Sequence, residues 1–145
     1  MDWHYRFLML AAHVAEWSKD PSTKTGAVIA RPDRTVVSLG YNGFPRGVGD
    51  TPARLEDRNV KYDLMIHCEM NAVLSAHDDV RGCALYTWPF ASCIRCAVHM
   101  VQAGIGAAVF PTLPERLTER WAESVRQTKK IYDESGVTWI EIPPK

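Results

Sequence analysis

Apolar residues near the N-terminus recur at the spacing of an amphipathic helix. Steps of three and four residues bring such positions onto one face, which can then pack against a core. Asp20-Pro21-Ser22 follows this segment. The proline ends the helix because it disfavours helical conformation at the residue before it. The sequence therefore predicts a first helix whose buried stripe consists of Trp3, Phe7, Leu10, Ala11 and Val14.

Two apolar runs come next, at residues 26–30 and 36–41, with Arg31-Pro32-Asp33-Arg34 between them. A short polar segment with an early proline is typical of a turn, so the two runs predict a β-hairpin. Residues 42–61 are rich in glycine, proline and charge and show no period. We predict a long loop there, and long loops in small domains are often functional.

Strand-like and helix-like segments alternate after residue 65. Short apolar runs predict strands at 83–87, 107–110 and 137–142. Helical patterns separate these strands. This alternation is typical of a layered α/β domain in which neighbouring strands are parallel.

Three helices are predicted in this second half. The first spans about 68–77, and the second follows Cys93 and ends at Gly104. Thr112-Leu113-Pro114-Glu115 fits a capping box at the start of the third, which Gly136 ends. The predicted inward positions are, in chain order, Met70, Val73 and Leu74; Ala97, Met100, Val101 and Ala103; and Leu117, Trp121, Val125 and Tyr132.

The charges balance, with 17 basic and 17 acidic residues among 145. A protein that coats DNA normally carries a basic surface, so a nucleic-acid partner is not expected. No apolar run approaches the ~20 residues of a membrane span, and the N-terminus lacks the layout of a signal peptide. We therefore expect a single cytoplasmic domain over residues 1–145, with no membrane partner.

The four cysteines are Cys68, Cys83, Cys93 and Cys96. In an oxidising compartment they could form two disulfides. In a reducing cytosol, a CxxC pair with a histidine nearby is more typical of a metal or redox site. A thioredoxin-like pair should follow the first strand of its fold, whereas this pair lies much later in the chain. The pattern favours a metal.

Two motifs, His67-Cys68-Glu69 and Cys93-Ile94-Arg95-Cys96, each open a predicted helix. A CxxC at a helix start places two sulfurs on one side, and the helix N-terminus stabilises their thiolate form. Zinc binds thiolate and imidazole in a tetrahedron, and three protein ligands leave one position for water. His67 would be the third ligand. The metal lowers the pKa of that water toward ~7, and Glu69 could take its proton.

Together the motifs resemble the zinc signature of the cytidine and deoxycytidylate deaminase superfamily, H-x-E followed by P-C-x-x-C. The resemblance extends to residues 18–29, 40–47 and 102–105, which look like the deoxycytidylate deaminase branch. It covers about residues 3–112, and the last thirty residues carry no recognisable motif.

This resemblance implies a fold and an activity. The fold would be α/β, a three-layer α/β/α sandwich with a mixed sheet of about five strands, in a homo-oligomer. The activity would be hydrolytic deamination of a small cytosine nucleotide, dCMP to dUMP and ammonia, with one catalytic Zn²⁺ per chain. The implied site has His67, Cys93 and Cys96 as ligands, Glu69 as proton shuttle, Asn42 against the sugar or base, and the Cys68 backbone N–H facing the pyrimidine carbonyl.

The sequence departs from this pattern at two positions. Cys68 stands where the family usually has alanine, and we expect it to fill the same space, since neighbours on a helix point apart. Ser92 stands where proline usually precedes the first cysteine, and the nearest proline is Pro89. Because of this change, the loop over residues 88–92 should have a different shape. In the family this loop usually receives the amino group of the substrate, so the resemblance defines the reaction more closely than the substrate.

Lys24, Arg46 and Arg54 could bind a phosphate or be solvated surface charges. Arg46 is the favoured phosphate ligand because it lies in the glycine-rich segment 43–49, whose backbone can approach an anion. Its planar guanidinium suits a phosphate. Tyr86 and Trp88 are expected in the core.

Three alternatives stay open from the sequence. One is a zinc deaminase of another amine, such as a cytidine nucleoside, a purine base such as guanine, or an RNA adenosine. Another is a zinc-stabilised binding module without turnover, although such a module would not need Glu69. The third is a thiol–disulfide protein, which would contain no stoichiometric metal.

Overall fold

The computed structural model describes residues 2–113 and 119–145, and within them five strands form one mixed sheet in the order β2-β1-β3-β4-β5. β1 (Gly26–Ala30) and β2 (Val36–Tyr41) form the predicted antiparallel hairpin. β3 (Ala84–Trp88) pairs antiparallel with β1. β4 (Ala107–Pro111) and β5 (Thr138–Ile142) continue the sheet in parallel, as the alternation of elements predicted.

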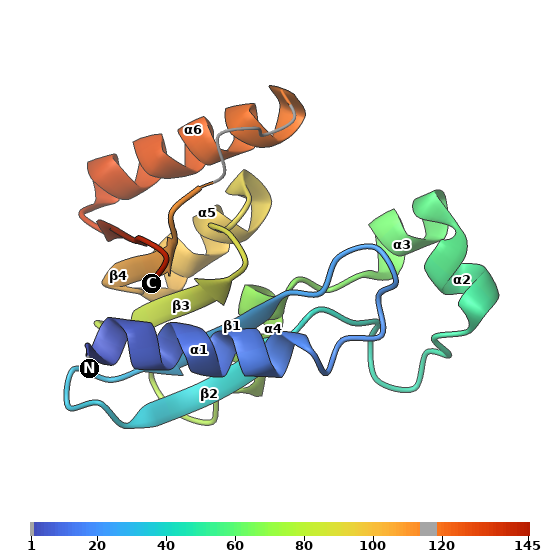
Figure 1. The fold of residues 1–145 in the computed structure, drawn as a ribbon, viewed down its shortest axis with the longest axis horizontal. Helices are drawn as coiled ribbons and strands as arrows, with labels where there is room; N and C mark the ends of the chain where they lie inside the picture. Colours follow the sequence, from blue (N-terminus) through green and yellow to red (C-terminus); the bar gives the residue numbers. More distant parts are fainter. Residues whose placement is uncertain (1, 114–118) are drawn as a thin grey trace.

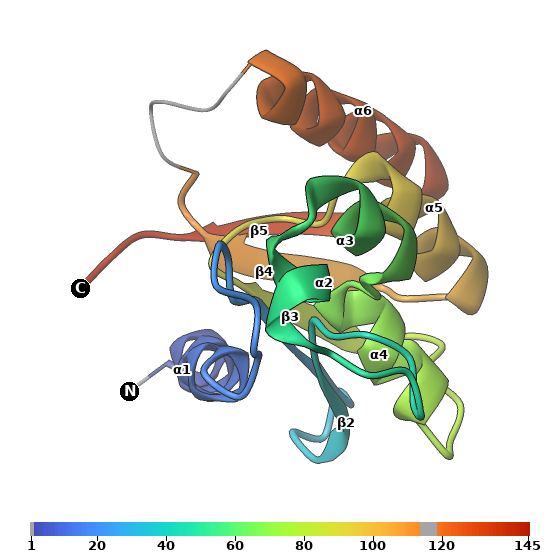
Figure 2. The ribbon, with the colours of Figure 1, turned by 90° about the vertical axis from the view of Figure 1, so that its right-hand side faces the viewer.

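Helices cover both faces of this sheet (Figures 1 and 2). Among the described helices, α1 (Trp3–Ala15) is the one that covers the first face. α4 (Cys68–Ser75), α5 (Ile94–Ala103) and α6 (Glu119–Ser135) lie on the other. The predicted three-layer α/β/α fold with a mixed sheet is confirmed. No helix in the described parts of the chain has the length and apolarity needed to cross a bilayer.

The central strand β1 is buried along its whole length because both of its faces are covered. Its alternate residues serve two cores. Val28 and Ala30 pack in the cluster under α1. Ala27 and Ile29 pack in the cluster that includes Cys68 of α4.

The prediction of a continuous loop over residues 42–61 is wrong in part. The structure places two short helices there and just beyond, α2 (Pro52–Glu56) and α3 (Arg58–Leu64), which project from the body of the domain (Figure 1). Thr51 caps α2 by accepting from Arg54 N, and Asp57 caps α3. Neither helix buries a residue. Both therefore lack the apolar period that sequence reasoning uses to recognise helices.

The structure also tests the inward faces and the ends of the predicted helices. α4 turns Cys68, Glu69 and Ala72 toward the interior, whereas Leu74, predicted inward, is 65% exposed. The predicted stops at Gly104 and Gly136 are confirmed, since both residues have positive φ. The predicted capping box reaches into residues 114–118, and Pro114, Glu115 and Leu117 lie outside the described residues.

The strand register brings three chain segments to one edge of the sheet. Gly26, the first residue of β1, is paired with both Tyr41 and Trp88, the last residues of β2 and β3. The segments that precede β1 and follow β2 and β3 therefore meet there. Gly43, just after β2, exchanges two backbone hydrogen bonds with Ile66, which places the start of α4 at the same edge.

Gly40 sets how closely α4 approaches β2. A Cβ atom at this position would overlap the carbonyl oxygen of Cys68 and the amide nitrogen of Ala72. We predict that Gly40→Ala lowers the free energy of unfolding by about 1–3 kcal/mol, because the helix must move away from the sheet. Urea unfolding measures this change.

Gly43→Ala is the matched control, since among the described residues no atom beyond Gly43 and its two chain neighbours lies within 4 Å of a Cβ built at Gly43. It should stay within about 0.5 kcal/mol of the parent chain. Equal stability of the two variants would contradict the close approach at Gly40.

Candidate metal centre and active site

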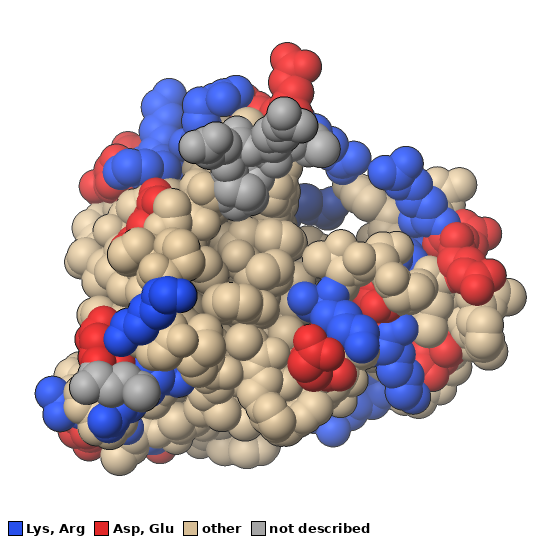
Figure 3. Space-filling view, viewed as in Figure 1, with Lys and Arg blue, Asp and Glu red and all other residues tan. Residues whose placement is uncertain are grey.

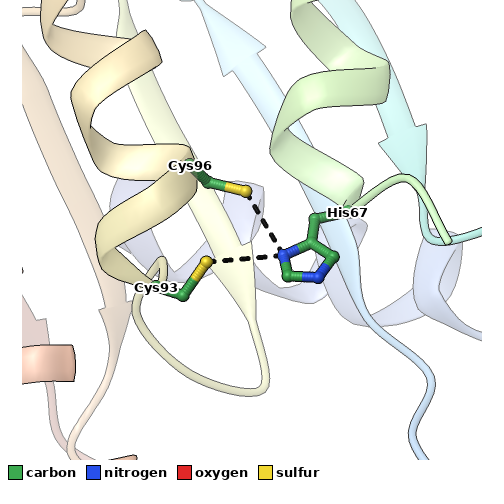
Figure 4. A group of neighbouring side chains, drawn as sticks. All are labelled: His67, Cys93 and Cys96. Atoms are coloured by element: carbon green, nitrogen blue, oxygen red, sulfur yellow. Dashed lines mark hydrogen bonds between the residues drawn. The ribbon is translucent and has the colours of Figure 1, made fainter. Parts of the chain in front are cut away.

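Three side chains of metal-binding type meet at the edge of the sheet described above (Figure 4). Nδ1 of His67 lies 3.2 Å from Sγ of Cys96 and 3.5 Å from Sγ of Cys93. All of the potential ligand atoms lie within 4.8 Å of one another. The structure thus brings together the three residues that the two motifs nominated.

The cluster forms because two helices begin side by side. His67 is the N-cap residue of α4 and Cys93 is the N-cap residue of α5. An N-cap side chain usually bonds to the first turn of its own helix, but neither of these does so. Both side chains are therefore available to a shared ligand. Cys96, in the first turn of α5, adds the second sulfur from the buried side.

The donor set and its spacing fit zinc. Ligands about 2.0 Å (nitrogen) and 2.3 Å (sulfur) from a tetrahedral zinc are separated from each other by about 3.6 Å. The two nitrogen–sulfur distances of 3.2 and 3.5 Å come close to that value. One imidazole and two thiols supply three ligands, and a zinc with three protein ligands retains a position for water.

The electrostatics of the cluster favour its metal-binding form. The hydrogen bond from Cys96 lowers the pKa of the Cys93 thiol to about 4. The same hydrogen bond raises the pKa of Cys96, since its proton is held between the two sulfurs. Hydrogen bonding to Cys93 raises the pKa of His67. One sulfur is thus ready to bind a cation as thiolate.

Glu69 places a buried carboxylate beside the cluster. Its side chain is almost completely buried, and Oε1 lies 3.9 Å from Nδ1 of His67. Its other oxygen, Oε2, accepts a hydrogen bond of 2.7 Å from the hydroxyl of Ser92. A carboxylate in this position can exchange protons with a molecule bound at the cluster.

A cavity of about 280 Å³ is lined in part by His67, Glu69 and Cys93. Three aromatic side chains, Trp88, Phe90 and Trp121, form part of its lining. Phe90 and Trp121 meet edge to face, with ring centroids 4.8 Å apart. Flat apolar walls of this kind suit a planar ring. Trp88, expected in the core, is therefore also a wall of the cavity, whereas Tyr86 is buried as predicted.

Asn42 and Cys68 also line the cavity. The amide of Asn42 accepts from Thr25 N and donates to Thr23 O, each at 2.9 Å, so it holds the segment that precedes β1. Cys68 is fully buried, and burial raises the pKa of its thiol. Its sulfur is not part of the ligand cluster. Both positions agree with a role in shaping the cavity, and their contact with substrate stays a prediction.

The predicted phosphate ligands are not part of the described cavity lining. Lys24 and Arg46 are exposed and are not among the described lining residues. Lys24 lies 4.0 Å from Glu16, and Arg54 donates to Gly49 O at 2.9 Å. No lysine or arginine lines the cavity within the described parts of the chain. Binding of phosphate by Lys24 or Arg46 stays a prediction.

Sequence reasoning missed three contributors to the site. Asp20 lines the cavity and pairs with Lys61 at 2.7 Å, and Trp121 reaches the cavity from α6. Trp121 belongs to no motif that could have indicated it, and Asp20 lies in the segment 18–29 that resembles the family but was given no role there. The contact of Ser92 with Glu69 did have a sequence signal, because serine replaces the proline of the zinc-deaminase signature at that position.

The amino-acid sequence is similar to known deaminases. It matches the cytidine and deoxycytidylate deaminase zinc-binding region over residues 1–112. An uncharacterized deaminase in the luxG 3′ region of Aliivibrio fischeri is 39% identical over 142 residues, covering 97% of this chain and 95% of that protein. The deoxycytidylate deaminase of Homo sapiens is 32% identical over 153 residues, covering 100% of this chain and 82% of the human protein.

The fold is similar to a solved structure of the same class. The crystal structure of dCMP deaminase from the cyanophage S-TIM5 in apo form superposes on this chain with a TM-score of 0.72. The superposition covers 96% of this chain and 96% of the phage protein. Its sequence identity is 16%, so this likeness supports the fold.

We predict that purified protein contains one zinc ion per chain, held by His67, Cys93 and Cys96. Alanine at any of the three should reduce the zinc content to near zero, because two ligands bind zinc far more weakly than three. Metal analysis by mass spectrometry measures the content. Cys68→Ala is the control and should keep its zinc. Full zinc in Cys93→Ala, or loss of zinc in Cys68→Ala, would show that the ligand set is different.

Proposed function

The chain belongs to the cytidine and deoxycytidylate deaminase zinc-binding family, and we propose that it deaminates dCMP to dUMP with release of ammonia. The observation that carries the proposal is the buried Glu69 carboxylate, which lies beside the cluster of His67, Cys93 and Cys96 and lines a cavity with aromatic walls. Full-length similarity to deoxycytidylate deaminases supports dCMP as the substrate.

The three ligands have a chemical purpose in this reaction. Zinc bound by His67, Cys93 and Cys96 would lower the pKa of a water molecule toward ~7, which makes hydroxide available at neutral pH. The two sulfurs and the imidazole come from elements that are fixed by the sheet, so the nucleophile is generated at one place in the cavity.

Glu69 carries the protons. It accepts the proton of the water that attacks C4 of the cytosine ring and delivers this proton to ring N3. It then transfers the remaining hydroxyl proton to the amino group, which leaves as ammonia while the C4 carbonyl forms. Water and dCMP are thus consumed, and dUMP and ammonia are formed. Oε1 lies on the side of the ligand cluster, where these transfers occur.

The cavity walls hold the ring for this attack. Trp88, Phe90 and Trp121 offer apolar surfaces against which a pyrimidine can pack. Asn42 keeps the segment of Thr23 and Thr25 in place as another part of the wall.

An uncharged cytosine nucleoside is the second candidate substrate, and one observation favours it. The described lining of the cavity contains no lysine or arginine that would pair with a 5′-phosphate. Lys61, which bonds to Asp20 of the lining, is already paired. Comparing nucleotide and nucleoside therefore decides between the two candidates.

Replacement of Glu69 by glutamine tests the proton shuttle. Glutamine keeps the size of the side chain but cannot accept a proton, so we predict that kcat falls by at least ~10²–10⁴-fold. Ammonia release from dCMP measures the rate. The zinc content should not change, since Glu69 is not a ligand. Turnover close to that of the parent chain would mean that another group carries the proton.

A comparison of dCMP with deoxycytidine tests the phosphate. One charge-assisted contact contributes ~1.5–3 kcal/mol, so kcat/KM should be at least about tenfold higher for dCMP. Arg46→Ala should reduce this preference and leave deoxycytidine turnover almost unchanged.

Arg34→Ala is the matched control, because Arg34 lies in the hairpin turn at the opposite ends of β1 and β2. Equal kcat/KM for the two substrates would contradict dCMP as the substrate. Activity on a purine or another amine alone would contradict it as well.

A further inference from the structure

Ser92 makes a contact that the zinc-deaminase signature does not provide. The signature has proline immediately before the first cysteine, and proline has neither a hydroxyl nor a backbone N–H. Here the side chain of Ser92 is buried, and its hydroxyl donates to Oε2 of Glu69 at 2.7 Å. The donor is therefore specific to this chain's departure from the signature.

This hydrogen bond distinguishes the two oxygens of Glu69. Oε2 is held by Ser92, whereas Oε1 lies 3.9 Å from Nδ1 of His67 and faces the ligand cluster. A carboxylate with one oxygen held cannot rotate without breaking a charge-assisted hydrogen bond, which is stronger than a bond between neutral groups. Ser92 therefore holds Oε1 on the side of the ligand cluster.

The C-terminal helix α6 in turn holds Ser92. The hydroxyl of Thr128, which is 0% exposed, donates to the backbone carbonyl of Ser92 at 3.0 Å. One helical turn earlier, the hydroxyl of Ser124 accepts from the backbone N–H of Ile94 at 2.9 Å. Residues four apart lie on one face of a helix, so one face of α6 supports the loop that carries Cys93.

We propose that Ser92 is a positioning residue for Glu69 and that Thr128 of α6 fixes Ser92 in place, an inference that rests on the proposed role of Glu69 in deamination. The chain of contacts runs from Thr128 through Ser92 to Glu69. It links the catalytic carboxylate to a helix outside residues 1–112, the segment that matches the family. Thr128 of the C-terminal helix thereby takes part in catalysis without touching the substrate.

Kinetics of Ser92→Ala test the proposal. Loss of a hydrogen bond to a charged group should lower kcat about 10- to 100-fold. KM should stay within about threefold, because the substrate does not contact the hydroxyl. Ser92→Thr restores a hydroxyl and should recover most of kcat. Thr128→Val should lower kcat by a smaller factor, since Ser92 keeps its hydroxyl but loses its support.

Ser38→Ala is the matched control. The hydroxyl of Ser38 is also buried and also bonds to α4, donating to Ala72 O at 2.6 Å, but it does not contact Glu69. The control loses one buried hydrogen bond to the same helix. It should keep kcat within about twofold of the parent chain. If Ser92→Ala and Ser38→Ala have the same kcat, the positioning role is overturned.

A double-mutant cycle tests the contact without any substrate. Ser92→Ala should raise the unfolding constant about tenfold when Glu69 is present and clearly less in the Glu69→Ala background. Chemical unfolding with equal zinc content measures both. Equal effects in the two backgrounds would overturn the inference.

An incorrect substrate and an incorrect role for Ser92 give different results in these measurements. If the parent chain deaminates only an amine other than dCMP, the proposed substrate is wrong, and the same variants are measured on that amine. A drop in kcat for Ser92→Ala then still supports the inference. A parent chain that turns over dCMP while Ser92→Ala matches the control supports the proposed function alone.

Discussion

The whole site depends on two helices that begin side by side at one edge of the sheet. His67 opens α4 and Cys93 opens α5. Their side chains meet because β2 and β3 end at the same edge of the sheet and the Gly43–Ile66 bridge holds the start of α4 there. Gly40 lets α4 lie against β2 without a side chain between them. In catalysis a displacement of about 1 Å can cost about 100-fold in rate. Packing far from the reacting atoms therefore determines whether the ligand atoms stay within reach of one ion.

The burial of the Glu69 carboxylate affects both the stability of the fold and the proposed proton transfer. A carboxylate that leaves water must be compensated by hydrogen bonds or charge, or its burial destabilises the fold. Ser92 supplies one hydrogen bond. A zinc ion held by the neighbouring cluster would supply positive charge. The groups that compensate the burial of the carboxylate are thus the same groups that orient its two oxygens. On the face shown in Figure 3, charged residues of both signs are scattered between uncharged areas and form no continuous basic band.

The cavity is shared between the part of the chain that matches the family and the part that follows it. The matched residues 1–112 contain the cluster and Glu69, so they determine the chemistry. α6 adds Trp121 to the cavity wall and supports the Ser92 loop from behind. A planar substrate would therefore contact surfaces from both parts, and its identity depends on side chains that the family signature does not include.

The sequence by itself determined most elements and the residues of the cluster. Periodicity reports burial, so α1, the β1–β2 hairpin and the alternating second half were predicted, and the motif spacing nominated His67, Cys93 and Cys96. α2 and α3 escaped prediction because they bury no residue and leave no apolar period. Only the tertiary structure decided that Lys24 and Arg46 are not part of the described cavity lining, and that Ser92 bonds to Glu69 across 23 residues and to Thr128 across 36. Local patterns do not encode such contacts, since they arise only when distant elements pack against the same sheet.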